Sequence, residues 1–206
     1  MTLGRLAFAL ILLGEIVQWG GIVIGGAAYP GYDSLRQYIS ELGATGAVTG
    51  WMVSWLVFVP SGLLILAGCL LAAWAMRRSV PGLLGWLLLA WYGASLTGAG
   101  IYPCEFECAR TEVTFNALMH DLVGGTGYLA VPIGIWLVTA AGRATGAAFV
   151  AFGVVCGLLA LIGFGGVVAD PEFGGLLQRV LEGSVTVFLL VAAWLMARGR
   201  LNPARA

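Results

Sequence analysis

Leu6-Ala-Phe-Ala-Leu-Ile-Leu-Leu-Gly-Glu-Ile-Val-Gln-Trp-Gly-Gly-Ile-Val-Ile-Gly-Gly-Ala-Ala-Tyr29 is the stretch that decides the fold. It is apolar almost throughout and exceeds the roughly 20 residues that an α-helix needs to cross the hydrocarbon core of a membrane. It is also too long for the apolar part of a signal peptide, and no clear cleavage site follows it. We therefore expect a retained transmembrane helix.

Five similar stretches follow, separated by Arg, Pro, Gly and acidic residues, as loop ends require. Together they predict one transmembrane domain over residues 1–206, an all-α polytopic bundle of about six helices. The predicted spans are Leu6–Tyr29, Trp51–Met76, Pro81–Tyr102, Asn116–Ala140, Gly146–Ala169 and Leu177–Ala197.

The composition agrees with a membrane protein and excludes several functions. Hydrophobic residues make up 60% of the chain and charged residues 10%, whereas soluble domains carry about 25% charged residues. The net charge is zero, so there is no basic surface for nucleic acid. One histidine and four cysteines are too few for a bis-histidine haem or a multi-cysteine metal array, and no lysine exists to hold retinal. We expect no cofactor and no metal.

The arginines predict the orientation in the membrane. The positive-inside rule places the arginine-rich loops in the cytoplasm, so both termini are expected there, in a multi-pass protein of the cell membrane. The predicted cytoplasmic group is Arg5, Arg77, Arg78, Arg143, Arg198, Arg200 and Arg205, and the opposite group is Arg36, Arg110 and Arg179.

The acidic residues gather on the predicted outer side. Acidic residues contribute little to topology, so this bias needs another explanation. Two remain open: a solvated outer rim, or an outward-facing site. Only Glu15 lies well inside a span, and the others are Asp33, Glu41, Glu105, Glu107, Glu112, Asp121, Asp170, Glu172 and Glu182.

The first outer loop is expected to contain a short amphipathic helix. Asp33 or Ser34 can cap its start, and Gly43 can end it in the left-handed conformation. Such a helix would lie on the membrane or cover the bundle as a lid. Its apolar face would consist of Leu35, Ile39 and Leu42, and its polar side would carry Arg36, Ser40 and Glu41.

The second outer loop contains Cys104 and Cys108. If it faces an oxidising compartment, the two thiols are expected to pair as a disulfide that holds the loop. A metal site is the alternative, but two thiols alone are too few ligands for it.

Two pairs of polar residues lie near the ends of the spans. His120, beside Asp121, could act as a general base because histidine titrates near neutral pH, or it could simply bond a neighbouring carboxylate. Arg179 and Glu182 are three residues apart and could pair on one helix face, or Arg179 could bind a lipid phosphate.

Glu15 and Gln18 share one face of the first span. An ionisable group at membrane depth costs at least about 2.5–3.5 kcal/mol unless it is paired or protonated, so this face should not meet lipid. A proton-relay or substrate role and a structural hydrogen bond between two helices both remain open.

Two fragments resemble the Domain of Unknown Function 998 family of small bacterial and archaeal membrane proteins. They are Tyr38-Ile-Ser-Glu-Leu-Gly43 after the first span, and Tyr102-Pro103 followed by His120. The family has a Ser-Asp/Glu-Leu-Gly motif in the first outer loop, then Phe/Tyr-Pro with nearby acids, then a histidine. Ser40, Glu41 and Gly43 match the first motif and His120 the second. The resemblance covers nearly the whole chain and implies a bacterial inner-membrane helical bundle of open function.

The same fragment is more distantly similar to the Tyr-Ile-Ser-Asp-Thr-Gly motif of the eukaryotic Frag, DRAM and Sfk membrane proteins. Those proteins are linked to lipid-anchor remodelling, lipid asymmetry and autophagy. In this sequence Leu42 stands where that motif has threonine.

These observations favour a protein that binds a lipid or lipid-like ligand at the outer leaflet, either with or without processing it. A small proton-coupled transporter, suggested by Glu15, and an accessory subunit with a membrane-protein partner or as a homo-oligomer are the alternatives. The candidate catalytic residues are His120, Glu41, Asp121 and Ser40, and the candidate ligand-binding residues are Arg36, Tyr38, Arg179, Glu182, Glu15 and Gln18.

Overall fold

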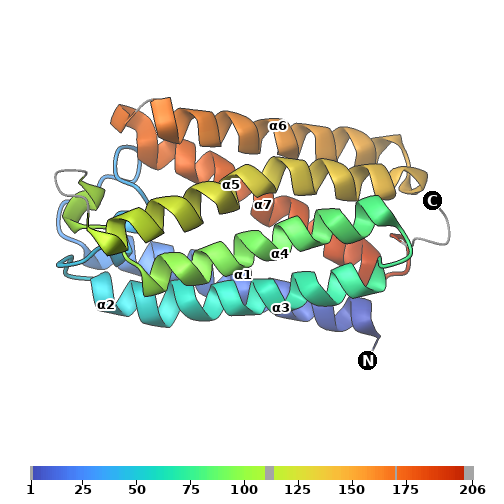
Figure 1. Ribbon diagram of the computed structural model, residues 1–206, viewed down its shortest axis with the longest axis horizontal. Helices are drawn as coiled ribbons and strands as arrows, with labels where there is room; N and C mark the ends of the chain where they lie inside the picture. Colours follow the sequence, from blue (N-terminus) through green and yellow to red (C-terminus); the bar gives the residue numbers. More distant parts are fainter. Residues whose placement is uncertain (1, 110–113, 170, 202–206) are drawn as a thin grey trace.

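The computed structural model of the chain describes residues 2–109, 114–169 and 171–201. All regular secondary structure in these ranges is helical, and six helices are long and apolar enough to cross a membrane, which confirms the predicted bundle (Figure 1). One span is continuous from α2 (Gly50–Val53) through a π-helical turn, η2 (Ser54–Phe58), into α3 (Val59–Ala75). The other spans are α1 (Leu3–Ala28), α4 (Val80–Ile101), α5 (Phe115–Ala141), α6 (Ala147–Ala169) and α7 (Gly174–Ala197).

The six spans form a closed ring. Each span packs against the next one along the chain, and α7 returns to pack against α1. Glycines allow the closest contacts: a Cβ added at Gly93 of α4 would lie 2.5 Å from the backbone nitrogen of Leu66 in α3. Gly21 and Gly25 of α1 likewise face Val57 and Val53, and their lack of side chains lets the two helices approach closely.

The two ends of the ring differ. At one end of the ring, α1 begins and α7 ends. Gly4 packs against Met196 there, and the connections between helices are short (Figure 1). We call this the short-loop end. The other end carries the loops after α1, α4 and α6, with the 3-10 turns η1 (Ser40–Gly43), η3 (Phe106–Cys108) and η5 (Pro171–Phe173), and we call it the cavity end.

The charged residues follow this division. Arg77 lies over the Trp74 ring and Arg198 over the Trp194 ring at the short-loop end, an arrangement typical of a membrane interface. Arg110, Glu112, Asp170 and Arg205, which also entered the prediction, lie outside the described residues. The described arginines group as expected from the sequence: Arg5, Arg77, Arg78, Arg143, Arg198 and Arg200 at the short-loop end, and Arg36 and Arg179 at the cavity end.

The amphipathic helix predicted for the first loop is not formed. A single turn follows Asp33, and only Ser40–Gly43 is helical, as the 3-10 turn η1. The reason is that the amide hydrogens needed to continue a helix go elsewhere: Tyr38 N donates to Glu41 Oε1 at 2.8 Å, and Ile39 N donates to Gln178 Oε1 at 2.7 Å.

The predicted apolar face is therefore only partly formed. Ile39 and Leu42 are buried, whereas Leu35 is 53% exposed. Gly43 is also not left-handed as predicted, since the positive-φ glycines are Gly31, Gly46, Gly146 and Gly199. A glycine is needed at position 43 for space instead, because an added Cβ would lie 2.7 Å from the Phe58 ring.

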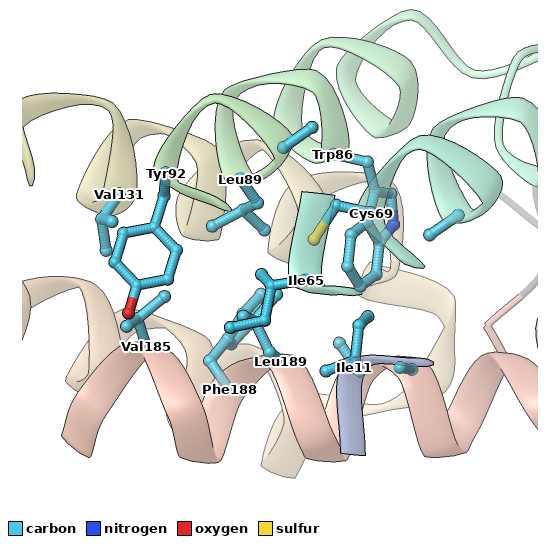
Figure 2. Close-up of a cluster of buried hydrophobic side chains, with 14 of the residues drawn as sticks. Ile11, Ile65, Cys69, Trp86, Leu89, Tyr92, Val131, Val185, Phe188 and Leu189 are labelled. Atoms are coloured by element: carbon cyan, nitrogen blue, oxygen red, sulfur yellow. The ribbon is translucent and has the colours of Figure 1, made fainter. Parts of the chain in front are cut away.

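The centre of the ring is an apolar core to which all six spans contribute. Figure 2 shows Ile11 of α1, Ile65 of α3, Trp86 of α4 and Phe188 of α7 packed together. Tyr92 lies at one edge of this cluster, and its hydroxyl reaches from α4 to α7 beside Val185. Beyond that hydroxyl the interior of the ring contains buried polar side chains, beginning with Glu182 and Gln18.

Candidate functional site

A cavity of about 650 Å³ occupies the cavity end of the ring. Its wall comes from α4, α5, α6, α7, the loops after α1 and α4, and Phe58 of η2. Of the residues predicted from the sequence, the structure places in this wall Arg36, Tyr38, Ser40, Glu41, His120, Asp121 and Glu182.

Glu182 lies at the inner part of the wall and is only 2% exposed. Tyr128 donates its hydroxyl hydrogen to Glu182 Oε1 at 2.7 Å, Gln18 Nε2 donates to Oε2 at 2.9 Å, and the Tyr92 hydroxyl also donates to Oε2. Four helices thus meet at one carboxylate. Hydrogen bonds of this kind offset the cost of burying it.

Gln178 connects this buried group to the first loop. Its Nε2 donates to the Tyr128 hydroxyl at 2.6 Å, while its Oε1 accepts from Ile39 N. A continuous chain of hydrogen bonds therefore runs from the η1 turn through Gln178 and Tyr128 to Glu182.

Glu41 organises the loop above the cavity. Its carboxylate accepts from Tyr38 N and from Gln37 Nε2 at 3.0 Å, and the side chain is buried. Burial raises the pKa of Glu41 above its ordinary value of 4.5, although both hydrogen bonds act in the opposite direction. This carboxyl is therefore easier to protonate than an exposed one.

The second loop, which follows α4, also lines the cavity. Cys104 and Cys108 form the predicted disulfide, and Glu107 and Cys108 have the uncommon positive φ values of 57° and 47°. One imidazole nitrogen of His120 lies within 4.8 Å of both sulfurs. These three side chains could supply metal ligands only with the disulfide reduced, since a metal binds thiolates.

The candidate catalytic residues His120 and Ser40 form hydrogen bonds with other groups of the cavity end. His120 Nδ1 lies 2.9 Å from the Tyr102 carbonyl oxygen, which can only accept, so Nδ1 carries the hydrogen. Ser40 Oγ lies 3.3 Å from Cys108 Sγ. Ser40 thus links the first loop to the second, and His120 links α5 to the end of α4.

Arg179 does not pair with Glu182, contrary to the interpretation of their spacing. Its guanidinium points out of the cavity, where Nη1 donates to the carbonyl oxygens of Gln37 and Gly175 and Nη2 donates to the Tyr32 hydroxyl at 2.7 Å. It lines a separate pocket of about 360 Å³. Adjacent helical positions point about 100° apart, which is why Glu182 faces inward with Gln178 and Arg179 does not.

Glu15 and Gln18 are buried in the ring but lie outside the cavity wall. Thr186 Oγ1 donates to Glu15 Oε2 at 2.7 Å, and Trp19 Nε1 donates to Thr186 Oγ1 at 2.9 Å. Among the described residues, Glu15 Oε1 and Gln18 Oε1 are buried acceptors with no donor. The predicted shared face of α1 is present, and it faces α7.

Sequence reasoning missed Tyr92, Tyr128 and Gln178. Tyrosines within apolar helices look like ordinary core or interface residues. A usable signal was present in α7, because Gln178 and Glu182 are four residues apart and so share a face.

The fold and the cavity define a polytopic membrane protein with six spanning helices and a polar site buried at one end of the ring. The family described as "Protein of unknown function (DUF998)" matches residues 12–195, and the chain belongs to this family. No curated protein and no solved structure matches the chain.

Proposed function

We propose that this protein binds an amphiphilic, lipid-like ligand from the membrane in the cavity between α4, α5, α6 and α7. The supporting observation is the cavity itself. Its volume of about 650 Å³ lies within the range of about 300–1,000 Å³ typical of small-molecule sites.

The wall of the cavity is divided in the way an amphiphile requires. Leu96 of α4 and Phe164, Val167 and Val168 of α6 supply an apolar side, and Glu182 with its tyrosines supplies a polar one. Val168 is also 70% exposed, so the apolar wall continues to the surface of α6 that would face lipid. A ligand with an apolar tail could enter there from the bilayer.

Filling the cavity should remove the ligand. A Cβ at Gly125 would meet no atom within 4 Å, so Gly125→Phe adds a ring to the cavity without a backbone clash. Gly20→Phe is the matched control, because Gly20 has equal space but lies on α1, away from the wall. We expect native mass spectrometry of protein purified in a mild neutral detergent to find a lipid on wild type and on Gly20→Phe that is missing from Gly125→Phe. The same lipid on all three would contradict the proposal.

A proton-coupled carrier is the second candidate, and Glu15 supports it. One oxygen of this buried carboxyl accepts no hydrogen bond, so a proton can bind there without displacing a donor. If this function applies, Glu15→Gln should abolish proton-driven uptake of the identified lipid into proteoliposomes. Glu172→Gln, at an exposed residue of η5, should not affect it.

A further inference from the structure

Glu182 is a buried carboxylate that forms no ion pair with any residue that the structure describes. Each tyrosine that bonds it receives a hydrogen from an amide, Tyr128 from Gln178 and Tyr92 from Gln18, so each directs its own hydrogen at the carboxylate. Both oxygens therefore accept hydrogen bonds, and all three donors are uncharged groups. Within the described residues the only ion pairs join Arg36 to Asp33 and Glu172.

The described part of the wall supplies no cation that bonds to Glu182. Among the described lining residues Arg36 is the one arginine; its side chain is 61% exposed and is shared between Asp33 and Glu172, two acids outside the wall. Arg179, the other candidate for a headgroup phosphate, is bonded outside the cavity. Among the described lining residues the charged side chains are thus mainly acidic, and these acids are Glu41, Glu105, Glu107, Asp121 and Glu182.

Aromatic side chains line the same cavity. Tyr92 and Tyr128 bond Glu182 through their hydroxyls, and Phe58 and Phe164 complete the lining, with the Tyr128 and Phe164 rings in edge-to-face contact at 6.5 Å. Ring faces beside a carboxylate are the surroundings that proteins use to bind organic ammonium groups, because the quadrupole of each ring attracts a cation. A phosphate would meet acids and ring faces instead.

We propose that the ligand of this cavity is a cationic amphiphile, with an amine or quaternary ammonium headgroup held at Glu182 between tyrosine rings and an apolar tail along α6. This inference rests on the proposed function and names its ligand class. The ligand's positive charge supplies the partner that Glu182 lacks within the described chain. A metal ion fits less well, since the oxygens of Glu182 already accept three hydrogen bonds.

Three probes with the same tail separate charge from tail binding: dodecyltrimethylammonium, dodecyl phosphate and neutral 1-dodecylglycerol. Isothermal titration in a neutral maltoside detergent measures each affinity. We expect wild type to bind the ammonium at least about tenfold more tightly than the neutral and anionic probes. Glu182→Gln should bring the ammonium affinity down to that of the neutral probe, while Glu182→Asp, which keeps the charge, should retain most of the preference.

Two further variants test whether the binding preference depends on the cavity. Glu172→Gln removes an acid from the same end outside the cavity wall, and it should leave the preference unchanged. Gly125→Phe should weaken all three probes. Equal binding of the three probes by wild type, or a preference for the phosphate, would overturn the ammonium assignment while leaving amphiphile binding intact. Binding of no probe by wild type would overturn the proposed function and this inference with it.

Discussion

Glu41 determines how the first loop is built. Its carboxylate takes the Tyr38 amide hydrogen and the Gln37 side chain, and this arrangement stops a helix and sets the η1 turn over the cavity. Burial raises the pKa of Glu41, so the folded protein holds a proton there more tightly than the unfolded chain does.

The stability of the folded state should depend on pH through Glu41. A raised pKa means that the contribution is fully present below the unfolded value of 4.5 and is lost as the pH rises through the folded value. Glu41→Gln removes this titration. We therefore expect the melting temperature of wild type, relative to Glu41→Gln, to fall as the pH rises from 4.5. Parallel melting curves across that range would contradict the assignment, and Glu172→Gln should behave like wild type.

At the scale of elements, the spans could be predicted from the sequence and the loop could not. A span needs only length and apolar composition, which are local properties. The form of the first loop depends on Gln178, 139 residues from its partner Ile39, and no local pattern contains that information. The predicted Arg179–Glu182 pair did not form for the same reason. Glu182 bonds to side chains of other helices, whereas Arg179 bonds to the first loop and to the Gly175 carbonyl oxygen. The candidate cavity residues do lie at one end of the ring, but the contacts of Glu182 with Gln18, Tyr92 and Tyr128 come from three other helices and no local pattern contains them.

The contact between α3 and α4 should not tolerate a methyl group at Gly93. An added Cβ would meet backbone atoms of Leu66, which cannot move without shifting a helix. We expect Gly93→Ala to cost about 1–3 kcal/mol, measured by thermal or denaturant unfolding in detergent. Gly183→Ala is the control, since an added Cβ there has open space and alanine favours a helix. Equal stability of the two variants would mean that the helices are not packed this closely.

At the scale of the whole molecule, the ring has one arginine-rich end and one acidic end. Six spans bring both termini to the arginine-rich end. The positive-inside rule predicts that this end lies in the cytoplasm and that the cavity opens on the opposite side.

Thiol labelling can test this orientation directly, because Cys69 and Cys156 are buried and the other two cysteines are joined. Asp33→Cys places a thiol at an exposed position of the cavity end, and Arg78→Cys places one at the short-loop end. A membrane-impermeant maleimide should label Asp33→Cys in intact cells and Arg78→Cys only after lysis. The reverse pattern would show the opposite orientation.

Closure of the ring by α7 also has a consequence for biosynthesis. Gln178, Glu182 and Thr186, all on α7, are the partners of Tyr128, Gln18 and Glu15. The ribosome makes this helix last, so the polar side chains of α1 enter the membrane before most of their partners exist. A chain that ends before α7 would leave Glu15 without its hydroxyl donor, and cellular quality control would be expected to degrade it.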